Sequence, residues 1–312
     1  MKGDLWVSRY ALEAGGRLNS RTDRVLFRGA LVRRGAGFGC VHPWPELGDP
    51  VLEECLVDLA GARRHRLVQR TVACLEADAA ARMEGRSLFE GLGVPESHAT
   101  LPELSEEVLV KAVERGFSRV KVKSRGTGEE TLSEVRRLSV KWPRVRWRID
   151  FNEGGKGEAI LSELATWTAE EKRAIDFLED PMPYHGRAWE VLAREGGLPL
   201  ANDRWIESER GESAFLVVKP AVNQLIDRGR VKVAQQVVTS YMDHPFGQAF
   251  AAWEAARAGV KTVCGLQTHG LFKPDAFTEM LGEVGPTFRV PEGTGLGFDD
   301  LLEKLPWERL AP

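Results

Sequence analysis

Three lysines occupy positions where they could take part in chemistry. Lys121 and Lys123 lie in the run 119–123 (Arg-Val-Lys-Val-Lys), and Lys219 ends another apolar run. Successive side chains of a β-strand point to opposite faces, so Lys121 and Lys123 are expected on one face and the valines on the other. Cations on a shared buried face repel one another and lose hydration. This face therefore requires anionic partners.

Carboxylates stand at the ends of the neighbouring strand-like runs. Asp150, Glu179 and Asp203 each close an apolar run, and helical patterns follow these runs. In a parallel α/β barrel, the carboxyl ends of the strands form the face that carries the active site. One such residue would more often make a salt bridge, whereas their recurrence on successive strands favours catalysis. The sequence therefore predicts an active-site rim of lysines and carboxylates.

The residue types on this rim indicate metal-assisted proton transfer. Carboxylate oxygens from adjacent strands are ligands that Mg²⁺ accepts, with Mn²⁺ as the alternative ion. A metal-held substrate carboxylate would stabilise the enolate that forms when the neighbouring carbon loses its proton. A lysine close to other cations has a lowered pKa and can act as the base. We therefore expect a small-molecule carboxylate as substrate.

The pattern of elements that must position this rim is typical of a barrel. Strand-like and helical runs alternate from about residue 96 to residue 280, as in repeated β/α units. We predict an α/β fold: a modified TIM barrel of the (β/α)7β type over residues 96–289. The predicted helices are 105–116, 129–139, 156–167, 186–195 and 245–258, and the segment 203–214 is too short for a full one. The predicted strands are 97–101, 119–123, 146–151, 175–179, 198–203, 214–219, 235–240 and 260–264.

The first 95 residues are predicted to form an N-terminal α+β capping domain. Residues 4–33 alternate as antiparallel strands do, and helical spacing follows over 50–61 and 71–85. The tail 290–312 is expected to pack on this domain. Residues 15–22 and 37–45 are predicted to close over the barrel mouth, because an enolate in open solvent would be reprotonated.

Composition narrows the classes of partner. The chain has 312 residues, 43% hydrophobic, which is enough for a barrel and a smaller domain, and its net charge is −3. This charge predicts neither nucleic acid nor an anionic membrane as partner. No run is long enough to span a bilayer and the start lacks a signal-peptide pattern, so we expect a cytoplasmic protein. The four cysteines have no ligand-like spacing and are expected to be reduced. Oligomeric state stays open.

Together these motifs resemble the enolase superfamily in its muconate-lactonising subgroup, and most of all its o-succinylbenzoate synthases. The barrel motifs are 121–123 (KVK), 148–152 (RIDFN), 177–181 (FLEDP), 202–203 (ND) and 218–220 (VKP). The narrower resemblance is carried by 37–45 (GFGCVHPWP), 84–89 (EGRSLF) and 237–247 (VVTSYMDHPFG).

This resemblance implies a reaction and a role for each rim residue. The reaction would be the loss of water from 2-succinyl-6-hydroxy-2,4-cyclohexadiene-1-carboxylate to give o-succinylbenzoate in menaquinone biosynthesis, so the enzyme would be a carbon–oxygen lyase. The implied catalytic residues are Lys123 as acid/base, Lys121 as its electrostatic neighbour and Lys219 across the substrate. The implied metal ligands are Asp150, Glu179 and Asp203. Substrate contacts are expected from Asn152, Arg148 and Ser240.

Two other activities remain open at this point. An N-acylamino acid racemase or dipeptide epimerase would use Lys123 and Lys219 on opposite faces of the substrate. Dipeptide epimerases usually carry Asp-x-Asp at the end of the eighth strand, and this chain reads Val-Cys-Gly-Leu-Gln-Thr over 263–268. A metal-independent Schiff-base aldolase would instead use Lys219 as its nucleophile.

Overall fold

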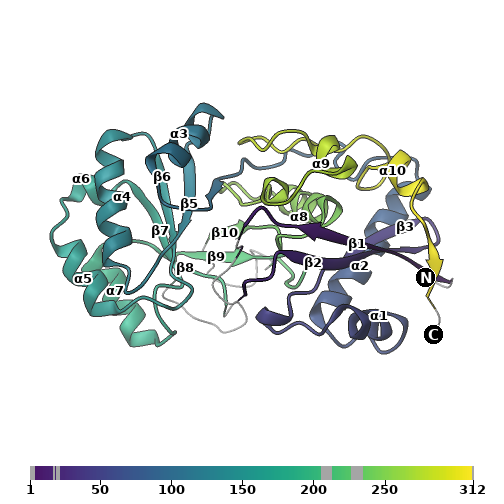
Figure 1. Cartoon of the computed structure of the whole chain (residues 1–312), viewed down its shortest axis with the longest axis horizontal. Coiled ribbons are helices and arrows are strands. Elements are labelled where there is room, and N and C mark those ends of the chain that lie inside the picture. Colours follow the sequence, from purple (N-terminus) through teal and green to yellow (C-terminus); the bar gives the residue numbers. More distant parts are fainter. Residues whose placement is uncertain (1–3, 17, 19–21, 205–212, 226–234, 311–312) are drawn as a thin grey trace.

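The chain folds around two sheets, the smaller of which is antiparallel. The computed structural model describes residues 4–16, 18, 22–204, 213–225 and 235–310. The small sheet has the order β11-β1-β2-β3, with α1 and α2 beside it (Figure 1). Its strands are β1 (Leu5–Glu13), β2 (Leu26–Arg34), β3 (Gly37–Val41) and β11 (Glu308–Arg309); the helices are η1 (Pro45–Leu47), α1 (Leu52–Ala60) and α2 (Arg66–Met83).

The second sheet is parallel and carries the predicted rim. Its order, β10-β9-β8-β7-β6-β5-β4, follows the chain strand by strand. Val120 and Val122 pack outward among buried apolar residues, which leaves the lysines of β5 facing inward. The strands are β4 (Ala99–Leu101), β5 (Arg119–Lys123), β6 (Arg146–Asp150), β7 (Ile175–Glu179), β8 (Leu200–Asn202), β9 (Phe215–Val218) and β10 (Gln235–Val238).

An eighth segment closes the barrel without forming a regular strand. Where a strand was predicted over 260–264, the described chain has two isolated bridges, which join Cys264 to Ser97 and Gly265 to Thr239. The amide of His98 donates to the Cys264 carbonyl at 2.7 Å, and the Gly265 amide donates to the Val238 carbonyl at 2.8 Å. The segment therefore links the two edge strands, and the α/β barrel with its capping domain is confirmed.

Helices cover the outside of the parallel sheet. In Figure 1, α4, α5 and α7 lie on one side of it, and α8 lies between the barrel strands and the small sheet. Ser105 caps α3 by accepting from the Val108 amide, as predicted for its N-terminus. The helices are α3 (Glu106–Glu114), α4 (Glu129–Lys141), α5 (Gly157–Ala165), α6 (Ala169–Lys172), α7 (Gly186–Gly196), α8 (Pro245–Arg257), η2 (His269–Leu271), α9 (Ala276–Leu281) and α10 (Asp299–Glu303).

The predicted flap is wrong over residues 37–41, and the prediction for 203–214 lies mostly outside the described residues. Residues 37–41 do not form a flap, because they are strand β3, buried against α2. A Cβ on Gly37 would lie 2.2 Å from the Leu75 carbonyl oxygen, so only glycine allows this contact. Most of 203–214 lies outside the described residues. The domain boundary near residue 95 stays a prediction. Within the described residues, no helix combines the length and apolar character needed to cross a membrane.

Candidate active site

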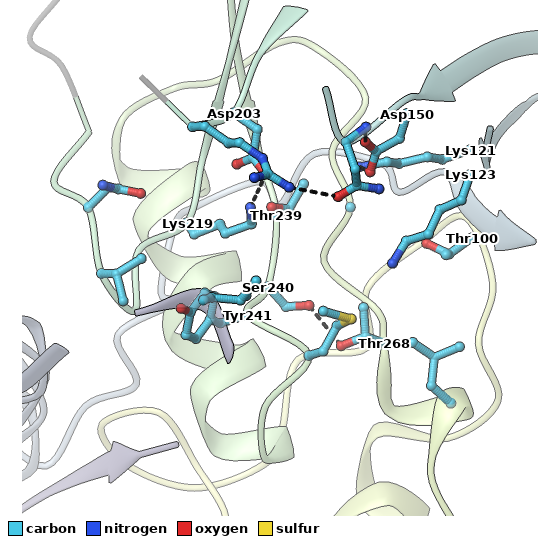
Figure 2. Close-up of a pocket in the computed structure, with 18 of the residues that line it drawn as sticks. Thr100, Lys121, Lys123, Asp150, Asp203, Lys219, Thr239, Ser240, Tyr241 and Thr268 are labelled. Atoms are coloured by element: carbon cyan, nitrogen blue, oxygen red, sulfur yellow. Dashed lines mark hydrogen bonds and ion pairs between the residues drawn. The ribbon is translucent and has the colours of Figure 1, made fainter. Parts of the chain in front are cut away.

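A pocket of about 630 Å³ opens at the carboxyl ends of the parallel strands. Figure 2 shows Lys123 and Lys219 entering it from opposite sides, with Asp150 and Asp203 along one wall. Hydroxyl groups line another part of the pocket, and the capping segment Leu47–Asp49 lies at its edge. The capping domain thus contributes part of the pocket lining. The lining hydroxyl residues are Thr100, Thr239, Ser240, Tyr241 and Thr268.

Lys121 lies between two carboxylates on the neighbouring strands. Its Nζ is 3.0 Å from Asp150 Oδ2 on β6 and 2.7 Å from Glu179 Oε1 on β7. Burial opposes the charge on this ammonium, but the carboxylates of Asp150, Glu179 and Asp203 outweigh it and hold the pKa of Lys121 above its usual range. Lys121 is therefore a fixed positive charge.

Lys123 is two residues further along the same strand, and its pKa is shifted in the opposite direction. Its Nζ donates a hydrogen bond to the carbonyl of Leu18, in the segment predicted to close over the mouth. Burial and the cations Lys121 and Lys219 lower the pKa of Lys123, although Asp150 partly opposes them. A lysine with a lowered pKa can give up its proton and act as a base.

Lys219 directly follows β9 and reaches the pocket from the side opposite Lys123. Its ammonium forms an ion pair with the carboxylate of Asp203. A Schiff-base nucleophile must present a free amine, so this pairing disfavours the aldolase hypothesis.

The three predicted substrate contacts are placed differently. Asn152 and Ser240 line the pocket, and the Ser240 hydroxyl lies 2.8 Å from the hydroxyl of Thr268. Arg148 does not reach it: its side chain is buried below the rim, pairs with Asp176 at 2.7 Å and lies 2.8 Å from His98 Nδ1. These contacts indicate that Arg148 supports the barrel interior.

The comparisons with known proteins decide the family. Residues 5–81 match the family model of the o-succinylbenzoate synthase N-terminal domain. Over 324 aligned positions the chain is 30% identical to an o-succinylbenzoate synthase from Bdellovibrio bacteriovorus, with 97% of each protein covered. The chain belongs to the o-succinylbenzoate synthase family. It is accordingly a lyase of the enolase superfamily, as the motifs predicted.

Solved structures of enolase-superfamily proteins share the fold of this chain. A superfamily member from Listeria innocua superposes with a TM-score of 0.76 at 15% identity, covering 99% of both chains. A dipeptide epimerase from Enterococcus faecalis, complexed with Mg and the dipeptide L-Leu-L-Tyr, gives a TM-score of 0.76 at 16% identity, covering 95% of this chain and 99% of its own. At such identities these structures support the fold alone.

The predicted metal ligands of this family member come together around lysines. Within the described residues, no three Asp, Glu, His or Cys side chains are grouped as they would be around a metal ion; Lys121 pairs with both Asp150 and Glu179. The donor set still suits Mg²⁺, because three carboxylates end adjacent strands. Burial raises the pKa of Glu179 to about 7, and Asp150 and Asp203 raise it against the effect of Lys121. A divalent cation would relieve this repulsion.

Sequence reasoning missed several residues of the site. His98 lines the pocket and is buried, and burial together with Arg148 and Lys121 lowers its pKa well below the usual range. Asp180 Oδ1 accepts a hydrogen bond from the backbone amide of Asp203 at 3.1 Å and so holds the backbone of that residue. The inward alternation of β4 could have indicated His98 and Thr100. Nothing in the sequence places the capping segment Leu47–Asp49 at the pocket.

Proposed function

We propose that this protein is a Mg²⁺-dependent o-succinylbenzoate synthase. It would convert 2-succinyl-6-hydroxy-2,4-cyclohexadiene-1-carboxylate to o-succinylbenzoate and water, as a step of menaquinone biosynthesis. The observation that carries the proposal is the near full-length identity of 30% to the Bdellovibrio synthase. The two lysines that face each other across the pocket agree with it.

Lys123 is proposed to perform both proton transfers. Its lowered pKa suits the removal of the ring proton next to the carboxylate. The hydroxyl group then leaves from the same face, takes the proton from the Lys123 ammonium and departs as water, and the ring becomes aromatic. Lys219, on the opposite face, stabilises the negative charge that develops on the substrate. Lys121 remains charged throughout because of its carboxylate neighbours.

Asp150, Glu179 and Asp203 are the proposed Mg²⁺ ligands. A bound Mg²⁺ supplies positive charge next to the substrate carboxylate. To hold the ion, these carboxylates would give up part of their pairing with Lys121 and Lys219. The predicted closing segment 15–22 lies partly outside the described residues; its Leu18 carbonyl accepts a hydrogen bond from Lys123.

Substitution of each lysine by arginine distinguishes this dehydratase from a racemase. Arg keeps the charge of Lys but is too basic to exchange protons. With o-succinylbenzoate formation followed by absorbance, Lys123→Arg should be nearly inactive, whereas Lys219→Arg should keep part of the wild-type rate. Wild-type enzyme should show little exchange of solvent deuterium into N-succinylamino acids.

The alternative, an N-acylamino acid racemase or dipeptide epimerase, needs both lysines to move protons. Equal inactivity of the two Arg variants, together with deuterium exchange faster than o-succinylbenzoate formation, would establish it. The chain lacks, over 263–268, the Asp-x-Asp that dipeptide epimerases usually carry, and Gly265 of this segment lines the pocket. This disfavours the dipeptide epimerase.

A further inference from the structure

One arginine of the capping domain reaches across to the barrel beside Lys219. Arg70 lies on α2, and its side chain is 12% exposed. Its Nη2 is 2.9 Å from Glu254 Oε1 on α8, and its Nε donates at 2.9 Å to the carbonyl oxygen of Pro220. The planar guanidinium holds both acceptors in a fixed geometry. Arg70 therefore joins three parts of the molecule: α2, α8 and the end of β9.

The Pro220 carbonyl belongs to the turn that carries Lys219. The amides of Val222 and Asn223 both donate to the Lys219 carbonyl, at 2.9 and 2.7 Å, so the chain turns sharply directly after this lysine. Pro220 is buried, and a buried carbonyl left without a hydrogen-bond donor destabilises the folded state. Arg70 provides a donor to this carbonyl.

The two contacts of Arg70 can be separated by mutation. Glu254 is 2% exposed and also pairs with Arg257 at 2.7 Å, so its charge keeps a partner when Arg70 is changed. Removing Arg70 therefore leaves the Pro220 carbonyl as the group most affected. Changing Glu254 instead weakens the ion pair but leaves the bond from Arg70 to Pro220 in place.

We propose that Arg70 is a positioning residue for Lys219: from the capping domain, it fixes the turn that aims the Lys219 ammonium at the substrate. This inference rests on the proposed function for the role of Lys219. Lys123 lies on β5 and is held by Leu18, so its position should not depend on Arg70. The placement of the capping domain would thereby be coupled to one of the two opposed lysines.

The test compares Arg70→Met with Glu254→Gln in the full-length protein. Arg70→Met keeps the packing against Phe250, whose ring centroid lies 5.4 Å from the guanidinium, and removes both donors. We expect kcat for o-succinylbenzoate formation to fall by about 10- to 100-fold with little change in KM, the cost of misplacing a group by about 1 Å. Glu254→Gln should lower the melting temperature by a similar amount but leave kcat near the wild-type value.

A readout independent of activity follows the two lysines directly. Brief acetylation with acetic anhydride, quantified by peptide mass spectrometry, gives the ratio of Lys219 to Lys123 labelling. This ratio should change in Arg70→Met and stay constant in Glu254→Gln. If Arg70→Met folds poorly, Arg70→Lys can replace it, because it keeps a positive charge opposite Glu254. It should show the same change in the labelling ratio, since one ammonium cannot reproduce the two hydrogen bonds of the planar guanidinium.

The outcomes distinguish a failure of the positioning role of Arg70 from a failure of the proposed function. Equal kcat and equal labelling ratios in Arg70→Met and Glu254→Gln would overturn the positioning role. A wild-type protein that forms no o-succinylbenzoate would overturn the proposed function, while the labelling ratio would still decide whether Arg70 positions Lys219.

Discussion

Two groups of buried polar side chains in this protein solve the same problem in opposite ways. At the rim of the barrel, opposite charges lie next to one another, and Lys121 keeps its charge by pairing with Asp150 and Glu179. Between the capping domain and the barrel lies a second group, which we term the interface cluster: Tyr10, Cys40, His42, Asp243 and His244. Here the Tyr10 hydroxyl lies 3.0 Å from His42 Nδ1 and 3.2 Å from Cys40 Sγ, and no ion pair joins the described members.

Burial removes charge in the interface cluster because no opposite charge compensates it. It lowers the pKa of His42 to about 3, an effect that Arg24 reinforces. It likewise lowers the pKa of His244 to about 3, reinforced by His42, and raises that of Asp243 to about 7. Burial alone thus favours the neutral form. At the rim, opposite charges counteract burial: they hold the pKa of Lys121 above its usual range and that of Asp150 below it, although burial still raises the pKa of Glu179 to about 7. Rim substitutions should therefore affect activity, and interface substitutions stability.

The largest expected effect comes from Lys123. Lys123→Met removes the proposed base, so kcat for o-succinylbenzoate formation should fall by about 10³- to 10⁴-fold. Because burial disfavours the charge of Lys123, its loss should leave the melting temperature unchanged or raise it. Calorimetry and the absorbance assay measure the two quantities. Substantial remaining activity would move the role of base to another residue.

Removing a carboxylate should come next. Asp203→Asn is expected to abolish activity and weaken Mg²⁺ binding by at least about 10²-fold, since even outer partners of metal ligands cost 10- to 100-fold. The fold should persist, because the ion pair of Asp203 with Lys219 is partly exposed. Isothermal titration calorimetry with Mg²⁺ measures the affinity. Unchanged binding would show that Asp203 is not a ligand.

The contrast between the two groups also explains what the sequence could predict. The rim follows from strand alternation and from charges at strand ends, so the sequence alone was enough to place Lys121, Lys123, Asp150 and Glu179 on adjacent strands. Contacts between the capping domain and the barrel join residues far apart in the chain, such as the Trp44 indole and the Tyr241 carbonyl at 2.9 Å. Local periodicity carries no information about such pairs.

The irregular parts escaped prediction for the same reason. The eighth barrel segment pairs through single bridges, so its strand pattern was too short to define, and a Cβ on Gly265 would lie 2.7 Å from the His98 ring. The family resemblance implies a substrate contact for Arg148, yet its side chain lies one layer deeper, where His98 and Asp176 hold it.

A pH-dependent gain in stability tests the interface cluster. The folded-state pKa of Asp243, about 7, exceeds its ordinary value of 3.8, so the folded protein binds this proton more tightly and Asp243 costs stability as the pH rises from 3.8 through 7. Asp243→Asn should therefore stabilise the protein at pH 8, by up to about 4 kcal/mol, and have little effect near pH 4. Urea unfolding at both pH values measures the difference.

Within the described chain, Oδ1 of Asp243 has no hydrogen-bond partner, which supports the same sign. A destabilised Asp243→Asn at pH 8 would mean that the folded protein holds this carboxylate as an anion.

The smallest effects are expected from two tyrosines, of which Tyr241 lines the pocket and Tyr10 belongs to the interface cluster. The Tyr241 hydroxyl donates to Asp49 Oδ2 at 3.0 Å and so ties the capping segment Leu47–Asp49 to the barrel at the pocket edge. Tyr241→Phe should cost about 1–2 kcal/mol of stability and raise KM, because Asp49 keeps only the Trp44 amide, at 2.8 Å, to hold it. Tyr10→Phe, which loses its contacts in the interface cluster, should cost a similar amount and leave KM unchanged. Urea unfolding and steady-state kinetics on both variants make the comparison, and an equal rise in KM would contradict the separation of the two groups.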